Sequence, residues 1–258
     1  RHYEKNGDPD MRNCKSIEEL TQLAYNHKYN MSPRGMSAYW AIVFKHLSFG
    51  DMPTYSKQMQ IRIKLGLPQY YNNMQTQMQI DQLIGKSLRD IERYNPRDLA
   101  TTAISLAKIM DNVRKSEKTK GSMEQILQEV LIGNNSQNRY LIFNRLAAAS
   151  IPILHEFEPR ELSNLIYAYG LANVIIPVKD GVTFFDILAD AAIAIPNLQH
   201  FNSQDLSNML WAYANVRVLQ WALFKKVADH ITIRFDYHHD AFKPHHLSNI
   251  VWSYATLN

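Results

Sequence analysis

The chain has 258 residues, 46% hydrophobic and 20% charged, so it can bury a sizeable core and is not a disordered polyampholyte. Its single cysteine excludes an internal disulfide framework and a cysteine-based zinc cluster, and its 9 glycines and 10 prolines are few for a turn-rich all-β sandwich. The net charge is +4. Residues 1–130 contain 19 Lys and Arg against 14 Asp and Glu, whereas residues 131–258 contain 9 against 10. A polyanion would therefore be attracted mainly to the N-terminal half, unless the excess of positive charge there is ordinary surface charge.

The first expected helix covers residues 16–27, where Ser16 and Glu19 have the spacing of a capping box. A second helix is expected from the segment MSPRGMSAYWAIVFKHLSF. Pro33 lies in its first turn, where a missing N–H costs nothing. We call this type of segment an A helix and Met36 its anchor.

A second copy of the A pattern, YNPRDLATTAISLAKIMDNV, is anchored at Leu99 and has Pro96 near its start. In both early copies, a further apolar helical pattern, which we call a B helix, follows only after a long insertion. The insertions are residues 51–77, rich in Gln, Met and Asn, and residues 114–138. The second contains the polar run RKSEKTKGS, which we expect to be a solvated or flexible loop.

Three closer copies of the A helix occupy the C-terminal half: FEPRELSNLIYAYGLANV, FNSQDLSNMLWAYANVRV and FKPHHLSNIVWSYATLN. Their anchors are Leu162, Leu206 and Leu247. These anchors are 44 and 41 residues apart, whereas the earlier spacings are 63, which is 22 more than the last one. Pro159 and Pro244 open two of these helices, and Ser203 is the expected cap of the third.

The B helices complete a regular alternation along the chain. We expect them at residues 78–91, 139–154, 184–195 and 221–233, with Pro152 kinking or ending the second. Alternating A and B helices predict an all-α fold, a right-handed α-solenoid of stacked helical hairpins with repeats of about 40 residues. We expect one helical-repeat domain, 1–258, without an internal domain boundary. Its parts are a leading helix near residues 16–28 and repeats near 31–93, 94–156, 157–200, 201–241 and 242–258, the last truncated.

The shared pattern of Pro, an anchor Leu, Ser-Asn, two apolar residues, an aromatic, a small residue and Tyr resembles the octotricopeptide-repeat family and its RAP-domain and FAST-kinase-like relatives. The leading segment MRNCKSIEELTQLAYNH is similar to the helix that opens the repeats of that family. The resemblance covers roughly Met11 to Asn258, closely in the last three A helices and loosely in the first two.

This resemblance implies a nuclear-encoded RNA-binding protein of the mitochondrion, or alternatively the chloroplast, that acts in organellar RNA metabolism or translation. Some relatives are structural proteins of mitochondrial ribosomes, and the irregular insertions favour such a role with rRNA and ribosomal proteins as partners. A protein-only scaffold is a third hypothesis, because the C-terminal half has no net positive charge. The chain opens with Arg1 and ends within a repeat, so we expect it to be an excerpt whose targeting peptide lies elsewhere.

Polar residues at equivalent positions of the last three A helices are candidate RNA contacts. The pairs that follow the anchors are Ser163 and Asn164, Ser207 and Asn208, and Ser248 and Asn249. An Asn amide both donates and accepts, so it can read a base edge in single-stranded RNA. Alternatively, the pair bonds a neighbouring helix and keeps the repeats in register.

A row of arginines follows the helix-opening prolines. It consists of Arg34, Arg97 and Arg160. Guanidinium groups beside the free N–H groups of a helix N-terminus suit phosphate, although each can also be a solvated residue of the first turn. A basic loop adds a second candidate phosphate contact or a solvated tether: Lys115, Lys118 and Lys120.

Aromatic residues share one further position of the A helices. Trp211 and Trp252 are candidate stacking platforms for bases, with Tyr167 at the same phase and Trp40 in the first copy, unless these rings are core packing between repeats. The tyrosines two positions later belong to the apolar face and are expected in the core: Tyr169, Tyr213 and Tyr254.

No pattern in the sequence indicates catalysis, a metal or a cofactor. Phosphate-cradling glycine loops, H-E-x-x-H and G-x-S-x-G are absent, and no partner residues make Cys14 a nucleophile. A histidine group looks like an ordinary loop cluster rather than a zinc site: His238, His239, His245 and His246. The longest apolar stretch, residues 187–196, contains Asp190 and is too short to span a bilayer. We therefore expect no enzyme activity, small-molecule substrate or membrane span.

Overall fold

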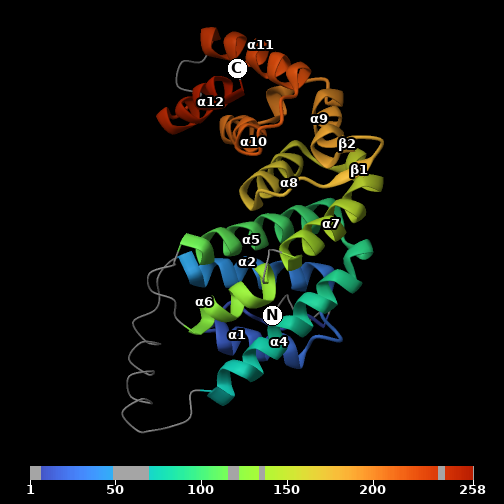
Figure 1. Ribbon diagram of the computed structural model, residues 1–258, viewed down its shortest axis with the longest axis vertical. Helices are drawn as coiled ribbons and strands as arrows, with labels where there is room; N and C mark the ends of the chain where they lie inside the picture. The colour runs from blue at the N-terminus through green and yellow to red at the C-terminus, as the bar shows by residue number, and fades with distance from the viewer. Residues whose placement is uncertain (1–6, 49–69, 116–121, 134–136, 238–241, 258) are drawn as a thin grey trace. The chain divides into compact units, whose positions relative to one another are not determined.

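A computed structural model describes residues 7–48, 70–115, 122–133, 137–237 and 242–257 (Figure 1). These residues are mostly helical, and their strands are confined to one short hairpin, which confirms the all-α class. Contacts divide the chain into two compact units. Unit 1 comprises Arg1–Tyr94 and Lys108–Ile142, and unit 2 comprises Asn95–Ala107 and Phe143–Asn258. The sequence pattern had shown no such division.

Unit 1 contains the leading helix and the first A and B helices. Its elements are α1 (Ile17–Asn26), α2 (Pro33–Ser48), α4 (Tyr70–Arg89), the 3-10 turn η2 (Ile91–Arg93), the C-terminal part of α5 (Pro96–Lys115), α6 (Ser122–Leu127), the π-helical turn η3 (Gln128–Ile132) and the start of α7 (Gln137–Ser150). Helix α4 packs against both α1 and α6, and α1 packs against α2.

The expected leading helix is confirmed, together with its cap. The backbone N–H of Glu19 donates to the Ser16 hydroxyl at 3.2 Å, and the Glu19 carboxylate accepts the backbone N–H of Lys15 at 2.8 Å. The reciprocal bond therefore reaches one residue further back than in a standard capping box.

Two buried side-chain hydrogen bonds join the three main helices of unit 1. The hydroxyls of Thr21 on α1 and Tyr39 on α2 are 2.9 Å apart. On the same helix, Trp40 donates its indole N–H to the hydroxyl of Ser87 on α4 at 3.1 Å. Full burial raises the pKa of the Tyr39 phenol far above its usual value. These bonds satisfy polar groups that the apolar core would otherwise leave unpaired.

The second insertion contributes helical structure rather than only a loop. Of the polar run, Arg114 and Lys115 end α5, and residues 116–121 lie outside the described residues. The chain then forms α6 and η3, whose apolar side chains are buried and which pack on α4. This segment ends at Gly133, which has a φ of 67°. The insertion therefore enlarges the core of unit 1.

Unit 2 holds the three closely matching repeats. Its elements are the N-terminal part of α5, most of α7, the 3-10 turn η5 (Ile151–Glu156), α8 (Pro159–Ala172), β1 (Pro177–Lys179), β2 (Val182–Thr183), α9 (Phe184–Ala194), the 3-10 turn η6 (Leu198–His200), α10 (Ser203–Asn215), α11 (Trp221–Tyr237) and α12 (Pro244–Leu257). The A helices α8 and α12 pack on either side of α10, and the B helix α9 packs against α11 (Figure 1).

The A helices α8, α10 and α12 are each bonded in the same way to the B helix that precedes them. Three tyrosine hydroxyls donate to backbone carbonyl oxygens of phenylalanines: Tyr169 to Phe143 at 2.7 Å, Tyr213 to Phe185 at 2.8 Å and Tyr254 to Phe224 at 2.7 Å. The rings of each pair also meet edge to face, with centroids 4.9 to 5.2 Å apart. Tyr169 and Tyr213 lie fully in the core as expected, and Tyr254 is half-buried.

Most helix boundaries follow the sequence signals. Helix α7 ends at Ser150 and continues as a 3-10 turn containing Pro152, so the expected break is confirmed. The cap of α10 was assigned wrongly, because Ser203 is its first helical residue. Asn202 is the cap, and its side-chain oxygen accepts the N–H of Asp205 at 2.9 Å. Both residue types favour this position, and only the position of the first turn decides between them.

Small residues set the distance between two neighbouring A helices. A Cβ atom added at Gly170 of α8 would lie 2.4 Å from the Cβ of Ala212 on α10. The side-chain amide of Asn215 also crosses this junction and donates to the Gly170 carbonyl at 3.0 Å. Glycine is therefore required here by close backbone approach. Over the described part of the chain, no helix has both the length and the apolar composition of a membrane span.

Candidate nucleic-acid interface

The A helices α8, α10 and α12 of unit 2 share an exposed stripe, which we call the A-face. It consists of the positions two before and two, five and nine after each anchor, which lie on one side of a helix because they are spaced by four, three and four residues. On α8 these are Arg160, Asn164, Tyr167 and Leu171; on α10, Gln204, Asn208, Trp211 and Asn215; on α12, His245, Asn249, Trp252 and Thr256. All twelve are exposed or half-buried.

The asparagines form the second row of the A-face. Asn164, Asn208 and Asn249 are half-buried, and within the described residues their side-chain amides make no hydrogen bond. A half-buried amide without a protein partner is satisfied by water or by a ligand. The structure therefore places these three predicted residues on adjoining helices, with amides that the described residues leave to water or to a ligand.

The serines that precede them lie on a different side of each helix. Ser163 is fully buried, and its hydroxyl donates to the backbone carbonyl of Asp205 on α10 at 2.9 Å. Ser207 is also fully buried, and its hydroxyl has no partner among the described residues. Ser248 is exposed and donates to the Pro244 carbonyl within its own helix. Ser163 therefore makes the inter-helix bond of the alternative interpretation.

The predicted arginines are exposed at the starts of their helices. Arg34 lies in unit 1, whereas Arg97 and Arg160 lie in unit 2, so the three are not brought together as one described surface. Burial raises the pKa of the Asp205 carboxyl, and the positive charge of Arg160 opposes that rise. Arg160 therefore already interacts electrostatically with the Asp205 carboxylate.

The N–H groups beside these arginines are occupied by side chains of the protein. Glu158 and Glu161 form a capping box at the start of α8. Asn95 accepts the N–H of Asp98 at the start of α5 at 2.9 Å. At the start of α2, the Asp8 carboxylate accepts the backbone N–H of Ser32 at 2.7 Å. The guanidinium groups, rather than the helix ends, thus remain to contact phosphate.

The predicted basic loop is only partly described. Lys115 is the last residue of α5, has a mostly exposed side chain and pairs with Asp111 one turn earlier at 2.7 Å. Lys118 and Lys120 lie outside the described residues.

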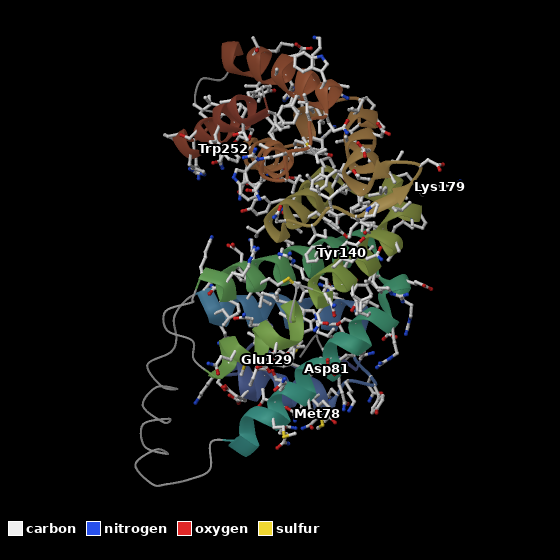
Figure 2. The ribbon with its side chains drawn as sticks, in the orientation of Figure 1. Met78, Asp81, Glu129, Tyr140, Lys179 and Trp252 are labelled. Atoms are coloured by element: carbon white, nitrogen blue, oxygen red, sulfur yellow. The ribbon has the colours of Figure 1, made fainter. Side chains whose placement is uncertain are left out.

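The aromatic row of the A-face forms a continuous ladder. The ring centroids of Tyr167 and Trp211 are 5.3 Å apart, and those of Trp211 and Trp252 are 6.5 Å apart with the rings inclined by 29°. The ladder is open to solvent at Trp252, which is 44% exposed and is labelled on α12 in Figure 2. Trp40, in contrast, is fully buried in unit 1.

Sequence reasoning missed the last row of the A-face. Leu171, Asn215 and Thr256 follow the aromatic residues by one turn, and extending the helical spacing from the asparagines identifies them. Asn215 is already bonded to the Gly170 carbonyl. Its role is therefore to join α10 to α8.

The histidines do not form a metal site in the described part of the chain. No group of three or more His, Cys, Asp or Glu residues there could hold an ion. The buried His246 accepts the backbone N–H of Lys243 on its Nδ1 at 3.3 Å, and desolvation lowers the pKa of its imidazole. His238 and His239 lie outside the described residues.

Comparison with known proteins gives no assignment of this chain. No protein-family model, curated protein or solved structure matches it.

Proposed function

We propose that the chain is an organellar RNA-binding α-solenoid that contacts single-stranded RNA along the A-face. The observation that carries this proposal is the row of three half-buried asparagine amides, unpaired within the described residues, beside a row of neighbouring aromatic rings of which Trp211 and Trp252 are stacked. Amides supply the donors and acceptors that base edges need, and aromatic rings supply stacking surface. By its repeat resemblance, we expect the protein in the mitochondrion, or alternatively the chloroplast, acting in RNA metabolism or translation.

The repeated packing of unit 2 supports the solenoid part of the proposal. Three A helices adjoin in chain order, and each donates a tyrosine hydroxyl to the B helix before it. A unit that repeats the same internal bonds presents equivalent residues at regular intervals along one face. That regular presentation is what a linear polymer such as RNA can follow.

Charge on the A-face favours base recognition over general phosphate binding. Arg160 is the one arginine or lysine among its twelve residues, and α10 contributes none. A surface with few cations displaces few counterions, so its affinity for RNA falls only gently with salt. We therefore expect selectivity among RNA sequences and a shallow salt dependence.

A filter-binding experiment with a library of short single-stranded RNAs tests the proposal. One sequence should bind best, and Asn164→Ala combined with Asn208→Ala should remove that preference while keeping the fold. Asn144→Ala, at an exposed position of α7, is the matched control and should retain the preference. Equal affinity for every sequence, with a steep loss in salt, would show that only the RNA backbone is contacted.

A second candidate function is a structural role in a mitochondrial ribosome or another large ribonucleoprotein. What motivates it is the irregular repeat length and the two insertions, of which the second forms α6 and η3 outside the alternation of A and B helices. Co-sedimentation with a ribosomal subunit through a high-salt wash would support this role. Undetectable RNA affinity at low salt would instead support the protein-only scaffold.

A further inference from the structure

Arg139 is a half-buried cation of unit 1 without a counter-charge among the described residues. It is the third residue of α7, and the Nε of its guanidinium is buried and makes no hydrogen bond. It also makes no ion pair with a described residue. Withdrawing a charge from water costs free energy unless hydrogen bonds or an opposite charge offset the loss. An unpaired guanidinium in such a place therefore points to an anion that the protein binds.

Two other shielded cations of the chain are satisfied by the fold itself. The ammonium of the buried Lys86 meets the Asp90 carboxylate at 2.5 Å. The half-buried Lys226 donates to two backbone carbonyls at the end of α9, each at 2.6 Å. Buried polar groups that serve the fold are paired in this way. Arg139 departs from this pattern.

The charge that acts on Arg139 is positive. Burial, and then the positive charge of Arg114 in the last turn of α5, lower the pKa of the Arg139 guanidinium. The Asp111 carboxylate is 3.7 Å from Arg114 and already pairs with Lys115 at 2.7 Å. The first turn of α7 contains no acidic residue, and a positive charge at a helix N-terminus is unfavourable. A bound anion would relieve each of these repulsions.

The turn that carries Arg139 is held in place by its neighbour. The side-chain amide of Asn138 donates to the backbone carbonyls of Glu129 and Val130 in η3, at 3.3 Å and 2.9 Å. These bonds fix the start of α7 against η3. A side chain on a fixed backbone loses less freedom when it binds a ligand.

We infer that Arg139, supported by the charge of Arg114, binds one phosphate group, which the RNA backbone supplies in the proposed function. A guanidinium presents its N–H donors in a planar fork that matches two phosphate oxygens. The inference rests on the proposed function for the source of the phosphate. It adds to that function a contact in unit 1 that is independent of base sequence, at a residue that the repeat pattern did not identify.

Thermal denaturation of the full chain in inorganic phosphate, compared with chloride at equal ionic strength, tests the site without RNA. With phosphate at ten times its dissociation constant, the melting temperature of the wild type should rise by about 3 to 6 °C. Arg139→Gln should abolish this rise, and Arg139→Met replaces it where that variant does not fold. Arg93→Gln, at an exposed position of unit 1, is the matched control and should retain the rise. In chloride, Arg139→Gln should melt no lower than the wild type.

Filter binding of short single-stranded RNA at increasing chloride concentrations tests the RNA backbone as the source. Loss of one phosphate contact should weaken binding about tenfold at low salt and reduce the slope of log affinity against log salt by about 0.7. Arg139→Gln should show both changes and keep the preference among RNA sequences. Asn164→Ala combined with Asn208→Ala should lose the preference and keep the slope.

The outcomes separate this inference from the function on which it rests. If phosphate protects the wild type and Arg139→Gln equally, or if the variant melts lower in chloride, Arg139 serves the fold and the site is refuted. Glu117 lies outside the described residues, and phosphate protection that appears only after Glu117→Gln would show that a carboxylate of the chain takes this position, which also refutes the site. Unchanged RNA affinity and salt slope in Arg139→Gln would refute the RNA backbone as the source. If no RNA binds the wild type, the proposed function fails, and the melting experiment still decides whether the site binds phosphate.

Discussion

Two glycines in helices should respond in opposite directions to the same substitution. Gly170 lies at the contact of α8 with α10, where an added Cβ would be 2.4 Å from the Ala212 Cβ and 2.5 Å from its Cα. Gly85 lies in α4, and the nearest atom to an added Cβ there is a terminal guanidinium nitrogen of Arg89 at 3.3 Å. The first neighbour is fixed by backbone, whereas the second is the end of a flexible side chain.

Three contributions determine how much each substitution changes the free energy of unfolding. Replacing glycine by alanine within a helix gains up to about 1 kcal/mol from backbone propensity. At Gly170 this gain is opposed by overpacking, which costs about 1 to 3 kcal/mol. Separating the helices also breaks the bond from the Asn215 amide to the Gly170 carbonyl, worth about 1 kcal/mol. Gly170→Ala should therefore lower the free energy of unfolding by about 1 to 3 kcal/mol, and Gly85→Ala should raise it by about 0.5 to 1 kcal/mol.

Urea denaturation followed by tryptophan fluorescence measures both effects, because Trp211 reports on unit 2 and Trp40 on unit 1. Ala212→Gly in the Gly170→Ala background removes the closest of the two short contacts and should recover part of the loss. A Gly170→Ala chain as stable as the wild type would refute the close approach of α8 and α10. A shift of the same sign in both glycine variants would show that propensity alone governs these positions.

Three further substitutions test other parts of the structure. Ser163→Ala should lower the free energy of unfolding by about 1 kcal/mol, because the hydrogen bond to the Asp205 carbonyl is lost. Ser248→Ala should have almost no effect, because its exposed hydroxyl bonds only within its own helix. Thermal denaturation of the two variants measures this difference. Lys226→Met should lower the free energy of unfolding by about 2 kcal/mol, because the Lys226 ammonium donates to the Ile193 and Ile195 carbonyls at the end of α9. Urea denaturation should show no such loss for Lys225→Met, because the ion pair of Lys225 is exposed. Burial raises the pKa of the Asp205 carboxyl in the folded chain above its ordinary value of 3.8. Its contribution to stability is therefore full below pH 3.8 and is lost as the pH rises through the raised pKa. Melting temperatures measured from acid to neutral pH should show this pH-dependent loss in the wild type but not in Asp205→Asn.

The helices could be predicted where a residue acts on its own backbone. A proline fixes the start of a helix because its ring sets φ and its missing N–H is not needed there, and α8 and α12 begin at Pro159 and Pro244 as expected. The same reasoning placed the break at Pro152. The β1–β2 hairpin was missed although Asp180 and Gly181 carry a known turn signal, with φ of 52° and 81°.

Structure that depends on distant contacts was less predictable. Helix α6 and the turn η3 follow a strongly polar run and are not part of the repeat, so no periodic pattern marked them. Their side chains Met123, Leu127 and Leu131 become a core only because α4 packs against this segment. A short apolar segment without a period predicts burial, but it does not say which element will bury it.

The adjacent Ser-Asn pairs show why a repeat pattern alone cannot separate binding residues from packing residues. A residue that faces the next repeat and a residue that faces a ligand recur with the same period, since both follow from the same stacking. Neighbouring helical residues point about 100° apart, so Ser163 enters the α8–α10 contact while Asn164 remains at the A-face. The repeat pattern therefore identified six candidate binding residues, and packing against a neighbouring helix separates the serines from the asparagines. Where such a helix packs, at Ser163 and Ser207, the hydroxyl is buried; where none of the described helices does, at Ser248, it is exposed. Within the described residues, the asparagines stay half-buried and unbonded in all three repeats, so their amides are left to water or to a ligand.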